Sequence, residues 1–134
     1  MKKKIILSLA LVVALLVSNP AIVLADDPPQ VTSSIGGVTV TGNSSAYVAS
    51  GSASTYMATY CPMVSVDVYT EYKGYDMETG ADIYMSPWRQ GMSSVLVIAN
   101  PNNEYCVTEY MKAIHHASDG IHAPWEGSTS ASYL

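Results

Sequence analysis

The stretch from Met63 to Lys73 alternates between two kinds of side chain, and this two-residue period constrains the fold more than any other feature. One set consists of Val64, Val66, Val68, Thr70 and Tyr72, and the other of Ser65, Asp67, Glu71 and Lys73. Successive side chains of an extended chain point to opposite sides, whereas a helix repeats about every 3.6 residues. The pattern therefore predicts a strand with one face in a core and the other in water.

The same reasoning predicts six further strands in the rest of the chain. They are expected at residues 31–41 (with a bulge at Gly36-Gly37), 46–59, 81–85, 93–99, 104–117 and 126–133. Helix-forming residues do not gather at helical spacing, and Asn100-Pro101-Asn102-Asn103 is a strong turn signal. We therefore expect an all-β fold, an antiparallel β-sandwich of about seven strands.

The two cysteines, Cys61 and Cys106, are expected to form a disulfide. Thiols of exported proteins usually pair, and a bridge closing the 45 residues from 61 to 106 would stabilise the fold by about 4 kcal/mol. A free nucleophilic or metal-binding thiol is the alternative, but no CxxC spacing supports it. The two positions suit an immunoglobulin-like sandwich, although the third strand lacks a Trp and Tyr105 stands one residue before the second cysteine rather than two. We infer that architecture without the family.

The first 25 residues have the organisation of a secretory signal peptide. Lys2 to Lys4 are basic, residues 5–17 are almost all apolar, and small or short side chains at 23 and 25 precede a cleavage site before Asp26. A membrane anchor needs about 20 apolar residues, which this run does not reach. We expect a secreted, extracellular protein with no transmembrane segment in the mature chain. Its residues 26–30 form a flexible N-terminal segment and residues 31–134 a single domain.

The mature chain is strongly acidic. Three of the six basic residues lie in the leader, so Lys73, Arg89 and Lys112 face eleven carboxylates, a formal charge of −8. Counterion release from nucleic acid and attraction to anionic lipid both require many cations. We therefore exclude nucleic acid and anionic membranes as partners.

Aromatic residues suggest a ligand-binding surface. Pro87 to Gly91 is expected to be a loop, in which Trp88 stands beside the guanidinium of Arg89 and the amide of Gln90. Loops on a rigid sheet are a common place for binding residues. Tyr84 and Trp125 are further candidates for ligand contact. The alternative is that Tyr and Trp fill the core and the sheet ends, because the chain has no Phe, and Trp125 in particular could cap the core.

Two patterns suggest metal ligands. Asp119-Gly120 favours a two-residue hairpin that would place His115 and His122 on one face, within reach of a shared ion, with His116 on the other face. Polar, exposed histidines that respond to pH are the alternative.

Asp76, Glu78 and Asp82 surround Gly80 and predict a weak calcium site, against the alternative of a solvated turn. No other cofactor is expected.

Catalytic motifs do not occur. The sequence holds no GxSxG, HExxH or SxxK, and Asp67 and Glu71 would lie about 13 Å apart along one strand. We expect a secreted binding module without enzymatic activity, with an extracellular protein or carbohydrate as partner. Its contact surface would be the loop around Trp88 and the hairpin from His115 to His122. A secreted antibacterial or toxin-like effector is the alternative.

Overall fold

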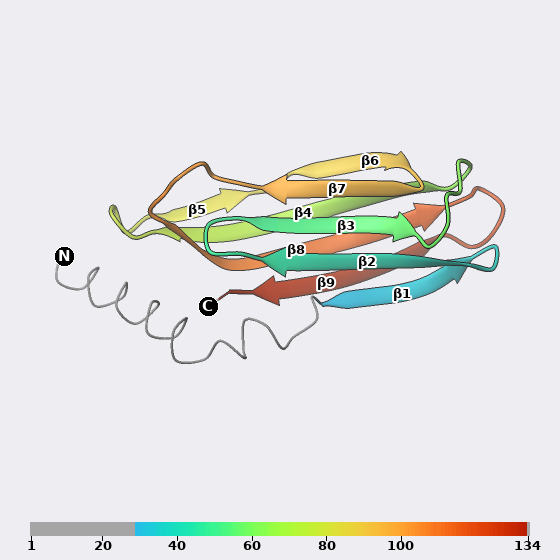
Figure 1. Ribbon diagram of the computed structural model, residues 1–134, viewed down its shortest axis with the longest axis horizontal. Coiled ribbons are helices and arrows are strands. Elements are labelled where there is room, and N and C mark those ends of the chain that lie inside the picture. The colour runs from blue at the N-terminus through green and yellow to red at the C-terminus, as the bar shows by residue number, and fades with distance from the viewer. Residues whose placement is uncertain (1–28, 134) are drawn as a thin grey trace.

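A computed structural model describes residues 29–133, which form an all-β fold of two antiparallel sheets (Figure 1). The strands are β1 (Gln30–Ile35), β2 (Val38–Ala46), β3 (Gly51–Met57), β4 (Ser65–Asp76), β5 (Asp82–Met85), β6 (Trp88–Met92), β7 (Ser94–Ala99), β8 (Cys106–Ser118) and β9 (Trp125–Ser132). No helix that could span a membrane is found among these residues. The predicted signal peptide lies outside them.

The strands divide into two sheets of different chemistry. One has the order β1-β2-β3-β7, and its strands contain no charged residue; we call it the neutral sheet. The other has the order β5-β4-β8-β9, with β6 also paired to β4, and carries the charged side chains of all the strands; we call it the charged sheet. Figure 1 shows the two sheets overlaid, which is the arrangement of a β-sandwich.

The predicted two-residue period of β4 is confirmed. Val66, Val68 and Tyr72 are fully buried between the sheets, whereas Tyr69 and Glu71 are exposed. Val40 of β2 and Met111 of β8 belong to the same buried core. The alternation read from the sequence thus identifies correctly which face of this strand enters the core.

The number of strands is nine rather than seven, for two local reasons. Gly36 and Gly37 form a tight turn, not a bulge, because both adopt the positive φ that a two-residue hairpin turn requires (58° and 81°). The expected strand at 31–41 is therefore split into β1 and β2. In addition, the expected loop at Pro87 to Gly91 contains β6, which pairs with β4.

The predicted disulfide is wrong. Both cysteines are free, and they are not at disulfide distance. Cys61 lies in the β3–β4 loop ahead of Ser65, the first residue of β4, whereas Cys106 pairs with Asp76, the last. These two ends of β4 are about 36 Å apart at strand rise, and a disulfide needs Cα atoms within about 7 Å.

The strand order also differs from that of an immunoglobulin domain. Here β1, β2 and β3 follow one another in the neutral sheet. In an immunoglobulin constant-type domain the second and third strands belong to different sheets.

One polar cluster crosses the core and joins the sheets. The fully buried His115 of β8 lies 2.9 Å (Nδ1) from Thr55 Oγ1 of β3 and 2.8 Å (Nε2) from Thr129 Oγ1 of β9. The Thr55 hydroxyl donates to the carbonyl of Asp67, so it accepts from His115 Nδ1–H. The Thr129 hydroxyl then donates to the unprotonated Nε2. Burial lowers the pKa of His115 to about 4, with a smaller effect of the neighbouring His116, so the ring is neutral at pH 7.

Candidate binding face

The outer face of the charged sheet is organised in rows that run across the strands. The registers place Gln90, Asp67, His116 and Glu126 side by side in one row, and Trp88, Tyr69, Ile114 and Ser128 in the next. Both rows are made by residues that alternate with the buried positions of β4 and β8. We call this surface the outer face and the two rows the polar row and the aromatic row.

The aromatic row presents an exposed apolar surface. The rings of Tyr69 and Trp88 stack with centroids 5.6 Å apart and an angle of 15° between their planes. Trp88 is 57% exposed, and Tyr69 and Ile114 are almost half exposed. Aromatic side chains that pack against each other at the surface retain free ring area that a ligand can cover. This row is therefore the apolar part of a candidate site.

The polar row is held together by His116. Its Nδ1 lies 2.5 Å from Asp67 Oδ1 on β4, and its Nε2 lies 2.8 Å from Glu126 Oε2 on β9. Partial burial alone would lower the pKa of His116, but the hydrogen bonds to Asp67 and Glu126 outweigh it and raise the pKa above its ordinary value. The rings of Tyr69 and His116 also form a T-shaped pair, with centroids 5.8 Å apart and an angle of 75° between their planes. The two rows therefore form one connected surface.

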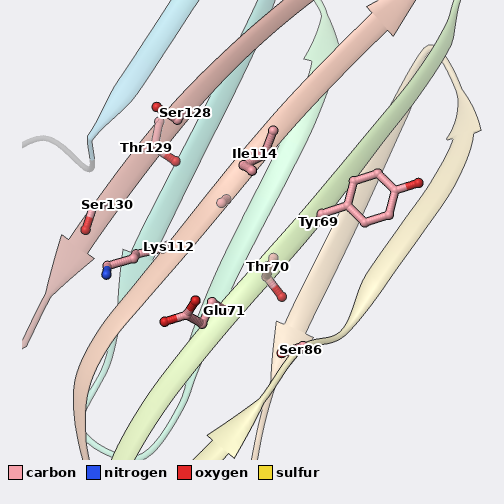
Figure 2. Close-up of a pocket in the computed structure, with 10 residues that line it drawn as sticks. Tyr69, Thr70, Glu71, Ser86, Lys112, Ile114, Ser128, Thr129 and Ser130 are labelled. Carbon is pink, nitrogen blue, oxygen red and sulfur yellow. The ribbon is translucent and has the colours of Figure 1, made fainter.

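Two open hollows flank the aromatic row, with volumes of about 550 and 340 Å³. Tyr69 and Ile114 line the larger hollow together with Glu71, Lys112 and serines of β9 (Figure 2). Figure 2 shows that these side chains come from β4, β8 and β9, with Ser86 from the segment before β6. The smaller hollow lies over the polar row and contains Asp67, His116 and Gln90. An apolar ridge between two hollows that contain both apolar surface and polar side chains can hold a ligand with both apolar and hydroxyl surfaces.

Three of the five predicted ligand residues share this side of the sheet. Trp88, Gln90 and Tyr84 pair with Tyr69, Asp67 and Lys73, whose side chains all lie on the outer face. Tyr84 stands over Lys73, whose Nζ is 5.9 Å from its ring centroid. Lys73 lies four residues along β4 from Tyr69, so Tyr84 is at the margin of the site.

The remaining two, Arg89 and Trp125, pair with the buried positions Val68 and Ala117 and so do not belong to the two rows. Arg89 pairs with Val68 and so belongs to the opposite side of β6, where it is exposed because β6 is a short edge strand. It does not stand beside the Trp88 ring as expected. Trp125 packs against the core and stacks on His115 at a centroid distance of 6.5 Å. It also lines the smaller hollow, but its packing supports the alternative reading, a cap on the core.

The predicted metal site of His115 and His122 is not formed. Ala117 pairs with Trp125 rather than with His122, so residues 119–124 form a longer loop instead of a two-residue turn. His115 points into the core, and His122 Nδ1 lies 2.5 Å from the Asp119 carboxylate in that loop. The predicted orientation of His116 to the opposite face is correct.

The calcium prediction at Asp76, Glu78 and Asp82 also finds no support. Asp76 Oδ1 accepts the backbone N–H groups of Glu78 and Thr79, and its Oδ2 accepts from Asn103 Nδ2. These bonds lower the pKa of Asp76, with Oδ1 engaged by its own turn and Oδ2 by Asn103 of the β7–β8 loop. Within residues 29–133, no group of three or more His, Cys, Asp or Glu side chains is placed to hold a metal ion.

Sequence reasoning missed the part that His116 and Glu126 play at the centre of the face, beside Tyr69. A signal was available, because Asp67 and Tyr69 occupy the solvent-side positions of the alternating segment. The sequence does not show that β4 pairs with β8 and β8 with β9, and these pairings place His116 between two carboxylates. No protein-family model, curated protein or solved structure matches this chain.

Proposed function

We propose that this protein is an exported binding module that uses its outer face to bind a carbohydrate and does not catalyse a reaction. The observation that carries the proposal is the exposed Tyr69–Trp88 stack, which lies between two hollows that each contain carboxylate side chains. One face of a sugar ring presents C–H groups that pack on an aromatic ring, while its hydroxyl groups require donors and acceptors at the ring edge. The export rests on the predicted leader, and the binding on the outer face.

The polar groups around the stack suit hydroxyl ligands. Carboxylates of Asp67, Glu126 and Glu71 accept hydrogen bonds, and the Gln90 amide both donates and accepts. Gln90 Nε2 is already 3.1 Å from Ser65 Oγ, which orients the amide in the smaller hollow. The mixture of a narrow apolar ridge and many hydroxyl-matching groups favours a saccharide.

Binding is favoured over catalysis by the state of the histidines. Both ring nitrogens of His116 are hydrogen-bonded to carboxylates, and both ring nitrogens of His115 are bonded to threonines inside the core. His122 Nδ1 is bonded to Asp119 away from the outer face. A general base must be able to reach a proton of the substrate. None of these rings has a free nitrogen that could accept a proton from a ligand bound at the aromatic row.

The proposal is tested by titrating purified protein with neutral oligosaccharides of glucose and of N-acetylglucosamine, with heat and tryptophan fluorescence as readouts. Trp88→Ala should weaken binding about tenfold, the loss expected for one aromatic contact of about 1.4 kcal/mol. Tyr60→Ala is the matched control, because Tyr60 is an exposed aromatic residue in the β3–β4 loop, off the outer face. Failure of every oligosaccharide to bind, or equal affinity of the Trp88→Ala variant, would overturn the proposal.

A further inference from the structure

The free edge of the neutral sheet has a composition unlike that of the other sheet edges. β7 is the terminal strand of the order β1-β2-β3-β7 and, among the described residues, pairs only with β3. Its sequence from Ser94 to Ala99 contains no charge, no Pro and no Gly. Leu96 and Ile98 are 51% and 61% exposed. An apolar, uncharged edge strand is the kind to which another strand adds readily.

The backbone of this edge has groups that point away from β3. Met57 N–H donates to the carbonyl of Ser93, which identifies the hydrogen-bonded positions of the β3–β7 ladder. Such positions alternate with non-bonded ones along an antiparallel ladder. Every second residue from Ser93 therefore bonds β3, and Leu96 and Ile98 turn their N–H and C=O groups outward. The same two residues supply the exposed apolar side chains.

Other edges of the sandwich carry features that oppose strand addition. β9 carries the charged Glu126 and is preceded by Pro124, β5 has only four residues and begins with Asp82, and β6 contains Arg89. β1 is uncharged but is built mostly of exposed polar residues and follows Pro29. Charges, short strands and prolines protect sheet edges from pairing. β7 has none of these protective features.

The distribution of charge indicates that the partner at the β7 edge is a second copy of this chain. The protein is acidic, so a second copy is repelled by most of its surface, and the charges of the strands lie in the charged sheet. Contact through β7 brings together two uncharged sheets and so avoids that repulsion. Antiparallel pairing of a strand with its own copy also satisfies a two-fold axis, the commonest symmetry of soluble oligomers. We propose that two copies of this chain pair through β7 and form one continuous neutral sheet of eight strands, four from each copy.

This arrangement is independent of the carbohydrate proposal. The outer face belongs to the charged sheet, and its side chains alternate with those that point toward the neutral sheet. A dimer would present two outer faces on one side of the assembly, which increases the avidity for a repeating ligand. Loss of dimerisation therefore leaves binding of a single short oligosaccharide unchanged, and loss of that binding leaves the dimer intact.

The experiment measures self-association by sedimentation together with amide hydrogen exchange. The purified protein should be a dimer, and the amides of Leu96 and Ile98 should exchange more slowly as protein concentration rises. Leu96→Lys should weaken association at least tenfold, because it places a charge at the pairing edge. Thr32→Lys, on the β1 edge of the same sheet, is the matched control and should dimerise like the wild type.

A second variant separates backbone pairing from apolar contact alone. Ile98→Pro removes one outward N–H and leaves the bonds to β3 in place, so it should also weaken association. Circular dichroism shows whether each variant keeps its β structure. A monomer at all concentrations, a Leu96→Lys variant that dimerises like the wild type, or no change in exchange at Leu96 and Ile98 would overturn the proposal.

Discussion

His115 and His116 are consecutive residues of β8 whose rings lie on opposite sides of the charged sheet, in environments that shift their pKa values in opposite directions. His115 is enclosed between Thr55 and Thr129, without a carboxylate to stabilise a positive charge. His116 is bonded to two carboxylates, Asp67 and Glu126. Two adjacent residues thus carry a neutral imidazole in the core and an imidazole on the surface whose protonated form is stabilised.

The first prediction concerns acid stability. The pKa of His115 is lowered from 6.5 to about 4 in the folded protein, so the unfolded chain takes up this proton first. His115 therefore destabilises the fold progressively as pH falls from about 6.5 to 4, by about 3 kcal/mol in total. Urea unfolding at a series of pH values measures the loss. A His115→Gln variant should show a flatter profile in this window, and an equally steep one would contradict the assignment.

The second prediction concerns His116. Its raised pKa means that it contributes stability below about pH 6.5, and the contribution disappears as pH rises through the folded value. In an NMR titration the ring protons of His116 should titrate above pH 6.5 and those of His115 well below it. Glu126→Gln should lower the pKa of His116 and leave His115 almost unchanged. The order of the two titrations is the critical observation, and its reversal would refute the arrangement.

The third prediction concerns the space around the buried ring. A Cβ atom at Gly42 of β2 would lie 2.3 Å from Cγ of His115. Gly42→Ala should therefore destabilise the fold by about 2–3 kcal/mol through overpacking. In a His115→Ala background the same substitution should cost much less, because the ring is gone. Additive effects in this double-mutant cycle would show that the two positions do not contact.

The fourth prediction concerns the thiols. Thiol titration of the unfolded, unreduced protein should give two free equivalents, since Cys61 and Cys106 lie at opposite ends of β4. In the folded protein Cys61 should react with an alkylating reagent and Cys106 should not. Cys106 is 2% exposed and its Sγ lies 3.3 Å from the Tyr72 hydroxyl. Cys61→Ser should change stability little, whereas recovery of a crosslinked peptide containing both cysteines would contradict the structure.

The sequence predicts correctly those features that depend on the side-chain alternation of a single strand. The period of β4, its buried Val66 and Val68 and the outward orientation of His116 all follow from local alternation. Strand ends were less accurate at Gly36-Gly37, where a turn and a bulge both accept glycine with positive φ.

Features that depend on pairing could not be predicted in the same way. An exported chain with two cysteines predicts a bond between Cys61 and Cys106, but only the register of β4 with β8 shows that they lie far apart. The calcium prediction could not take account of the hydrogen bonds of Asp76, which uses Oδ1 on its own turn and Oδ2 on Asn103 of the β7–β8 loop. The Asp67–His116–Glu126 row requires three strands in register, and no local pattern specifies that alignment.

The buried imidazole has a consequence for how the two layers fit together. A purely aliphatic interior tolerates small displacements of one layer over the other, because its contacts are not directional. The chain of bonds from Asp67 through Thr55 and His115 to Thr129 does not, since a shift of one residue would leave polar atoms unsatisfied in a dry environment. This single side chain thus fixes the relative translation of the layers and makes their alignment unique.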